Sequence, residues 1–212
     1  MNIKSKTWYE TWKNELSDHK YLILLSLVFL LFATIINLYA GKYVDNANVI
    51  PVNDIILDNI PTINVEWMFS YGMVVFLLIL VCYVLFFKVK QFHKAVFSFS
   101  TLILVRSFFI TLTHIGNPAD AIIITGIPGI YQSLNFHNDL FFSGHAAIPF
   151  MSFLLFNNEK IGMFFLFMTV VFSITVLLMH VHYSIDVFAA FFITYAVYVF
   201  TDWFGEKYFS RK

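Results

Sequence analysis

The chain has 212 residues, of which 59% are hydrophobic, 20% are aromatic and only 12% are charged. Together with a mean hydropathy of +0.76, this composition excludes an ordinary soluble domain and indicates a helical membrane protein. The net charge of +0 gives no reason to expect a nucleic-acid partner, and the one cysteine, Cys82, excludes a disulfide within the chain.

Residues 1–20 are polar overall but place Trp8, Trp12 and Leu16 at helical spacing, with four lysines around them. This pattern is typical of a short amphipathic helix that lies on a membrane surface. A frayed N-terminal tail is the plainer alternative. We predict the interfacial helix.

Six apolar segments follow, and each is long enough to be read as a membrane span. They cover residues 21–40, 68–87, 95–114, 141–156, 161–179 and 183–204. The predicted fold is therefore all-α, with a six-helix membrane domain over residues 21–204 and a short tail at 205–212.

The basic residues predict how this multi-pass membrane protein is oriented, because cytoplasmic loops carry an excess of Lys and Arg. With the N-terminus inside, the predicted cytoplasmic side holds Lys4, Lys6, Lys13, Lys20, Lys88, Lys90, Lys94, Lys160, Lys207, Arg211 and Lys212. The outer loops hold only Lys42, and Arg106 lies within the third span. We therefore expect both termini to be cytoplasmic, in a plasma membrane or a bacterial inner membrane.

Two polar clusters interrupt the apolar runs, one at residues 142–145 and one at residues 180–186. Ionisable side chains are costly in hydrocarbon, so such clusters point to function. Asp186 follows His182 by four residues, which puts both on one helical face. The carboxylate can then hold one imidazole nitrogen and leave the other nucleophilic, while His145 serves as the complementary acid. This set suits acyl or phosphoryl transfer on the non-cytoplasmic side.

Residues 138–145 read Asn-Asp-Leu-Phe-Phe-Ser-Gly-His, and residues 180–186 read His-Val-His-Tyr-Ser-Ile-Asp. The two segments resemble the catalytic motifs of the sphingomyelin synthase family, a branch of the lipid phosphate phosphatase superfamily. Asn138 stands where that family usually has Gly, and Ser184 stands where it has Thr. The acidic loop at residues 51–61 and the block around Arg106 resemble two weaker motifs of the same family.

The resemblance implies that His182 attacks phosphorus, that Asp186 orients it, and that His145 protonates the departing alcohol and then deprotonates the incoming one. It also implies supporting and substrate-binding positions. The supporting residues are Asp139, Ser143, Gly144, His180 and Tyr183, and the substrate-binding residues are Arg106, Asp54 and Asp58. For Arg106 a structural ion pair with a buried carboxylate is an equal alternative. No metal or other cofactor is expected.

The function implied is transfer of phosphocholine or phosphoethanolamine from a membrane phospholipid to ceramide or diacylglycerol, through a phosphohistidine. The same site acting with water would give a lipid phosphatase or a phospholipase C-like hydrolase. A metal-binding transporter with His145, His180, His182 and Asp186 as ligands is a third interpretation, and a structural membrane protein is the fourth. The apolar loop at residues 116–129 is either a cover over the site or an interfacial loop. A homo-oligomer is left open.

Overall fold

The computed structural model describes residues 7–125, 136 and 138–208 of the chain. Every regular element in these ranges is a helix, and one isolated bridge joins Ile50 to Ile115. The predicted all-α class is confirmed. Lys4, Lys6, Arg211 and Lys212 of the predicted cytoplasmic set lie outside the described residues, as do Gly126, Pro128 and Gly129 of the predicted cover.

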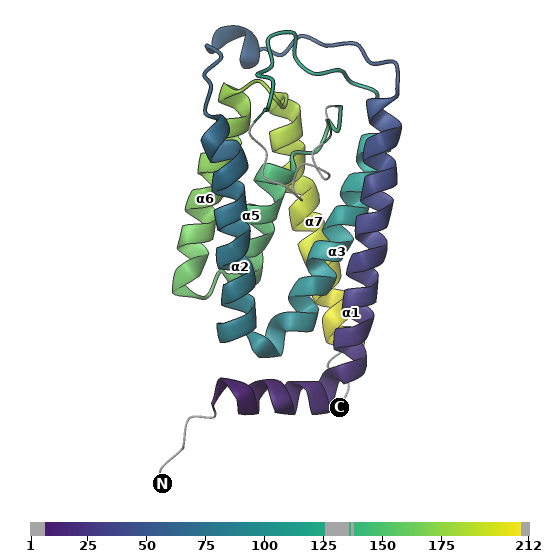
Figure 1. Ribbon diagram of the computed structural model, residues 1–212, viewed down its shortest axis with the longest axis vertical. Helices are drawn as coiled ribbons and strands as arrows, with labels where there is room; N and C mark the ends of the chain where they lie inside the picture. Colours follow the sequence, from purple (N-terminus) through teal and green to yellow (C-terminus); the bar gives the residue numbers. More distant parts are fainter. Residues whose placement is uncertain (1–6, 126–135, 137, 209–212) are drawn as a thin grey trace.

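The first helix, α1 (Trp8–Asp45), has 38 residues and is kinked at His19, whose backbone angles are not helical. Its first part lies across one end of the bundle and the remainder runs along it (Figure 1). The indole N–H groups of Trp8 and Trp12 both donate to the carbonyl oxygen of Leu85, at 2.9 and 3.0 Å. The segment predicted to lie on the membrane is thus helical from Trp8 onward and packs against the end of α2. Its position at a membrane surface remains a prediction.

Within the described residues, five helices are long and apolar enough to cross a membrane. They are α1, α2 (Met73–Phe87) with the π-helix η2 (Met68–Gly72) before it, α3 (Phe92–Leu112) with η3 (Val89–Gln91) before it, α6 (Lys160–Leu178), and α7 (Ser184–Tyr208). The predicted span at residues 141–156 corresponds to α5 (Gly144–Phe156), which has only 13 residues. Such a helix is about 20 Å long, which is shorter than a full span, so the sixth span remains a prediction. The orientation of the termini, which rests on the distribution of basic residues, also remains a prediction.

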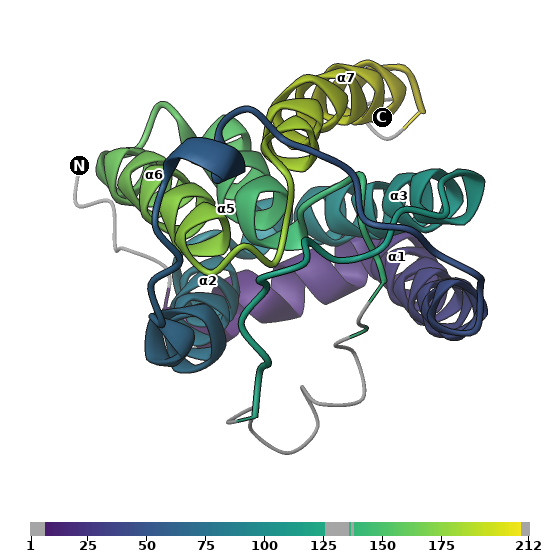
Figure 2. The ribbon, with the colours of Figure 1, turned by 90° about the horizontal axis from the view of Figure 1, so that it is seen from above.

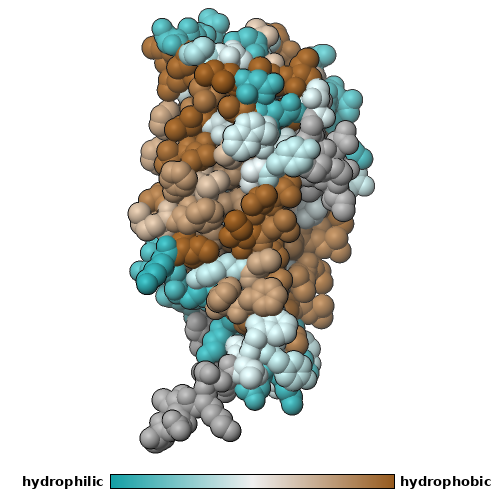
Figure 3. All heavy atoms as spheres, turned by 60° about the vertical axis from the view of Figure 1, so that its left-hand side comes forward, coloured by the Kyte–Doolittle hydropathy of each residue, from teal (hydrophilic) through white to brown (hydrophobic). Residues whose placement is uncertain are grey.

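The short helix α5 lies inside the bundle, with α6 and α7 beside it (Figures 1 and 2). Ala146, Ala147 and Met151 of α5 are almost fully buried and belong to a cluster that also holds Val176 of α6 and Val187 of α7. The small alanine side chains allow close approach of the neighbouring helices. The lipid-compatible surface belongs to the outer helices, where apolar residues cover most of the middle of the bundle (Figure 3).

The start of α1 and the end of α7 lie at one end of the bundle, whereas both polar motifs lie towards the other end (Figure 1). We call the latter the motif end. It is built from the connections after α1, after α3 and between α6 and α7, including the short 3-10 helix η1 (Leu57–Asn59). The bundle therefore brings three connections that are distant in sequence together around the start of α5.

Candidate active site

His182 and Asp186 form a buried pair at the start of α7. The Nδ1 atom of His182 lies 3.0 Å from Oδ2 of Asp186, and the Asp186 side chain is fully buried. Because a carboxylate accepts hydrogen bonds, Nδ1 carries the hydrogen and Nε2 keeps its lone pair. The contact expected from the four-residue spacing is present, and it leaves His182 in the tautomer that a nucleophile requires.

Asp186 also joins the two motifs to each other. Its Oδ2 accepts the backbone N–H of Tyr183 at 3.0 Å, and its Oδ1 accepts the backbone N–H of Phe141 at 3.0 Å. Phe141 has a φ of 85°, a left-handed conformation that is unfavourable for an aromatic residue. Such strain persists only where surrounding contacts over-determine it. The Asp186 carboxylate supplies one of those contacts, so the same side chain orients His182 and shapes the segment leading to His145.

His145 lies in the first turn of α5 and is held by Phe69. Its Nε2 atom is 3.1 Å from the carbonyl oxygen of Phe69, and the two rings stack with centroids 3.9 Å apart. Phe69 belongs to the π-helix η2, and such turns occur frequently at functional sites. Because a carbonyl oxygen only accepts, Nε2 carries the hydrogen in this contact.

Arg106 of α3 is paired with Asp139, which precedes α5. The Nη2 atom of Arg106 contacts the Asp139 carboxylate and also lies 3.3 Å from the Asp139 carbonyl oxygen. Its Nε donates to the carbonyl oxygen of Phe142 at 3.0 Å, and Nη1 lies 3.4 Å from Oδ1 of Asn37. Asp139, which is half-buried, therefore supplies the carboxylate expected for an Arg within an apolar helix. Among the described residues, the Asp139 carboxylate pairs with Arg106.

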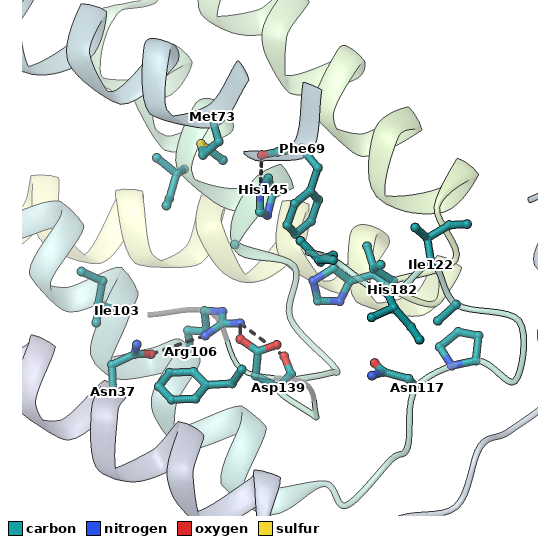
Figure 4. Close-up of a pocket in the computed structure, with 18 of the residues that line it drawn as sticks. Asn37, Phe69, Met73, Ile103, Arg106, Asn117, Ile122, Asp139, His145 and His182 are labelled. Atoms are coloured by element: carbon teal, nitrogen blue, oxygen red, sulfur yellow. Dashed lines mark hydrogen bonds and ion pairs between the residues drawn. The ribbon is translucent and has the colours of Figure 1, made fainter. Parts of the chain in front are cut away.

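One cavity of about 820 Å³ is faced by His145, His182, Arg106 and Asp139, whereas Asp186 does not line it (Figure 4). Its polar wall is formed by Asn37, Arg106, Asn117, Asp139, His145 and His182. Other lining residues lie about one helical turn further from the motif end, and most of them are apolar. These are Thr34, Leu77, Ile103 and Ile148. The cavity thus combines polar groups at the motifs with apolar side chains, which come both from the loop after α3 and from the middle of the bundle.

Gly144 lines the same cavity next to the arginine. A Cβ atom added to Gly144 would lie 3.6 Å from Nε of Arg106, which is an ordinary van der Waals contact. The fold therefore tolerates a methyl group here, and the space beside the guanidinium is what glycine keeps open.

Six of the predicted residues do not line the cavity. One is the buried Asp186 described above, one is Asp54, and the other four are as follows. Ser143 is fully buried, and its Oγ has no hydrogen-bond partner among the described residues. Tyr183 donates its hydroxyl to the carbonyl oxygen of Gly116 at 2.9 Å. Asp58 is exposed in η1. His180 is buried and turns towards the loop after α3. Their proposed roles remain predictions.

Asp54 is also outside the cavity, at the N-terminus of α7. Its Oδ2 accepts the backbone N–H of Ser184 at 2.7 Å and the Ser184 hydroxyl at 2.8 Å. Burial raises the pKa of the Asp54 carboxyl, but the hydrogen bonds from Ser184, Leu57 and Ile56 outweigh it and hold that pKa below its usual value. These contacts make Asp54 a cap for the helix that carries Asp186, whereas its predicted contact with substrate remains a prediction.

Sequence reasoning did not single out Asn37, Asn117 or Phe69. Asn37 offered a signal, because a polar residue within an otherwise apolar span usually has a partner. Asn117 is a polar residue in a loop, where such residues are common. Phe69 contacts His145 through its backbone carbonyl, which every residue has, so the sequence could not predict either position. In the described part of the chain, no group of three or more His, Cys, Asp or Glu residues is arranged to hold a metal ion. The transporter interpretation therefore has no ligand set there.

The apolar bundle, the buried His–Asp pair and the second histidine on a shared cavity define a membrane protein equipped for phosphoester chemistry. Residues 138–203, which contain both motifs, match the family described as PAP2 superfamily C-terminal. This match supports a place in the lipid phosphate phosphatase superfamily, and with it lipid phosphoester chemistry of the phosphatase or phosphotransferase type. No curated protein and no solved structure matches the chain.

Proposed function

We propose that the protein is a lipid phosphotransferase that moves a phospho-head-group from a phospholipid to a lipid alcohol such as ceramide or diacylglycerol. The proposal goes beyond the family match in naming transfer, the diester donor and a phosphohistidine at His182. It is supported by the charges and shape of the cavity.

In the first step, Nε2 of His182 attacks phosphorus and the bond from phosphorus to the diacylglycerol oxygen breaks. In this proposal the bound anionic phosphate stabilises His145 as the imidazolium, which gives its Nδ1 proton to the leaving oxygen, so diacylglycerol departs and the head group remains on His182. Asp186 stabilises the positive charge that develops on the attacked imidazole, through the hydrogen bond to Nδ1.

In the second step, the hydroxyl oxygen of the acceptor attacks phosphorus and the bond from phosphorus to Nε2 breaks. The hydroxyl proton passes to Nδ1 of His145, which restores the imidazolium. The Arg106 guanidinium and the N–H groups at the start of α5 are placed to stabilise the phosphoryl oxygens during both steps.

The observation that carries the proposal is the sparse positive charge in the cavity. Among the described residues that line it, Arg106 is the single Lys or Arg, and Asp139 already pairs with it. A phosphate monoester with close to two negative charges would require more cations than this. A phosphodiester carries one negative charge, so this wall suits a phospholipid donor better than phosphatidic acid.

The apolar part of the cavity supports the same substrate class. Ile103 of α3, Leu77 of α2 and Ile148 of α5 line it on different sides. An apolar chamber adjoining the reacting groups accommodates the first part of an acyl or sphingoid chain. A water-soluble phosphoester would leave this surface without a partner.

The proposal is tested by product analysis with a phospholipid whose head group is labelled, in micelles with and without added ceramide or diacylglycerol. We expect a labelled lipid product when an acceptor is present, and slow release of label when it is absent. His182→Ala should abolish both. His114→Ala is the matched control, because His114 is an exposed histidine outside the cavity.

Phosphatidic acid is assayed in parallel. Rapid release of inorganic phosphate from it, without any labelled lipid product from either acceptor, would replace the transferase with a phosphatase that uses the same residues. Wild-type turnover by folded His182→Ala would overturn the phosphohistidine itself.

A further inference from the structure

The loop after α3 forms one wall of the cavity. Residues 117–125, which we call the roof segment, contribute Asn117, Ala121, Ile122 and Ile124 to the lining. The loop passes over the motif end of the bundle (Figure 2), and Asn117 and Ile122 lie close to His182 in the close-up view (Figure 4). The roof segment therefore separates the nucleophile from the surroundings of the motif end.

Polar side chains fasten the roof segment at Asp120. The Asp120 carboxylate accepts Nδ1–H of His180, which lies 2.9 Å from both of its oxygens, and Oδ2 also accepts the hydroxyl of Thr62 at 2.8 Å. Thr62 comes from the connection after α1, and His180 comes from the turn between α6 and α7. Asp120 thus ties three connections together, and we call Thr62, Asp120 and His180 the roof clamp.

The roof clamp contacts the turn that carries His182. His180 is two residues before His182, is 2% exposed, and has a φ of 54°, in the left-handed region that is uncommon for histidine. The backbone N–H of Ile122 also donates to the carbonyl oxygen of Met179 at 3.0 Å. The roof segment is therefore bonded to both residues at the end of α6 that lead into the catalytic turn.

The Asp120 carboxylate is ionised under physiological conditions. The hydrogen bond from His180, and then the one from Thr62, lower the pKa of this carboxyl, although its side chain is 60% exposed. Hydrogen bonds to an ionised group are stronger than those between neutral groups. The contact between the exposed carboxylate and the buried imidazole therefore adds a charge-assisted anchor to two others in the roof segment, the bond from Ile122 to Met179 and the bonds from Thr125 to the Glu66 carboxylate.

We propose that the roof clamp positions the roof segment over the phosphohistidine and thereby favours attack by a lipid alcohol over attack by water. This inference rests on the proposed function. Attack by water breaks the same bond from phosphorus to Nε2 of His182, forms a bond from phosphorus to the water oxygen, and passes a water proton to His145. The products then are a free phosphorylated head group and diacylglycerol, and excluding water from the cavity suppresses them.

Two single variants and their combination remove the clamp, the first at an exposed residue and the second at a buried one. Asp120→Ala removes the carboxylate from an exposed position. His180→Asn removes the imidazole and keeps a residue that tolerates positive φ. Asn59→Ala is the control, because Asn59 is an exposed polar residue of the same end, and its amide donates to the carbonyl oxygen of Ile55 within its own loop.

The first measurement is the ratio of hydrolysed to transferred label with the acceptor present. We expect each clamp variant to raise this ratio by about tenfold, the size of effect produced by losing one charge-assisted hydrogen bond. The double variant should be no worse than the stronger single variant, because the two residues act through one contact. Asn59→Ala should keep the wild-type ratio.

The second measurement is hydrogen exchange of residues 117–125 in the same micelles, which needs no activity. Faster exchange in the clamp variants with an unchanged product ratio would show that the clamp holds the roof but does not control water. Unchanged exchange would show that the contact does not hold the roof, and either result overturns the inference. A wild-type protein without transferase activity refutes the proposed function instead, and the exchange data still decide whether the clamp holds the roof.

Discussion

At Asp186 a single carboxylate serves both the local fold and the proposed chemistry. It accepts hydrogen bonds from His182, Tyr183 and Phe141, which belong to two motifs about 40 residues apart in the chain. Removing it would leave buried donors unpaired as well as an unoriented imidazole. Loss of activity in an Asp186 variant is therefore a poor test of mechanism, and a residue that the fold does not require is a better one.

Gly144 is such a residue. We expect Gly144→Ala to fold normally, because the added methyl group would only reach van der Waals contact with Nε of Arg106 at 3.6 Å. The same methyl group occupies the space beside the guanidinium where a phosphoryl oxygen is proposed to bind. Turnover should therefore fall by about tenfold or more. The unfolding temperature and the transfer rate of the same preparation check both expectations.

Gly162 of α6 provides a control in which an added methyl group should lower stability without entering the cavity. A Cβ atom there would lie 2.5 Å from the backbone oxygen of Phe156, a distance that requires a backbone shift. Gly162→Ala should cost about 1–3 kcal/mol of stability, with activity lost only as the protein unfolds. If Gly144→Ala instead unfolds the protein and Gly162→Ala does not, the assigned roles of the two glycines are wrong.

At this scale, the spacing of residues predicted some contacts and not others. The pair His182–Asp186 follows from helical geometry, because four residues return to the same face. Arg106 signalled that it required an anion, but Asp139 lies 33 residues away, and only the packing of α5 on α3 brings them together. The contact between Asp120 and His180 spans 60 residues and left no signal in the sequence.

Among the elements, α7 depends on a cap from a distant loop. Asp54 lies 130 residues before Ser184 and accepts both its backbone N–H and its hydroxyl. Asp54→Asn should weaken these contacts and cost about 1 kcal/mol, which corresponds to a fall of about 2–4 °C in unfolding temperature for a chain of this size.

The effect of Asp54→Asn should depend on pH in a defined direction. Because the pKa of Asp54 in the folded protein lies below its usual value of 3.8, its stabilising contribution is complete above that value and is lost as the pH falls through the folded pKa. The difference in unfolding temperature between wild type and variant should therefore be constant from pH 8 to about pH 5 and shrink below about pH 4. Asp58→Asn, an exposed neighbour in the same loop, serves as the control. A difference that grows on acidification would contradict the cap.

The long apolar helices could be predicted because their composition and length define them, whereas the local irregularities could not. The predicted span at residues 68–87 begins with one π-helical turn, Met68–Gly72, and continues as an α-helix. That turn places the Phe69 carbonyl oxygen against His145. No residue type demands it, so only the packed structure reveals it.

For the whole molecule, the orientation in the membrane is the main untested expectation. In a background lacking Cys82, a cysteine at Asn59 should react with an impermeant thiol reagent from outside intact cells, and one at Lys90 should not. Both positions are exposed and lie at opposite ends of the bundle. The excess of basic residues at the predicted inner side is the physical reason. A reversed labelling pattern would move the cavity to the cytoplasmic face.

In the proposed reaction, the shortness of α5 would set how deep the reacting groups lie in the bilayer. A 13-residue helix rises about 20 Å, whereas the hydrocarbon core is about 30 Å thick. α5 connects to α6 at the end opposite the motifs. If that end lies at the predicted inner boundary of the hydrocarbon, we expect His145 to lie about 10 Å below the level that a full span would reach. A phospholipid must sink by roughly that depth to present its phosphorus, whereas the hydroxyl of ceramide or diacylglycerol already lies below the phosphate layer. Local thinning of the membrane around α5 would then assist the donor and make little difference to the acceptor.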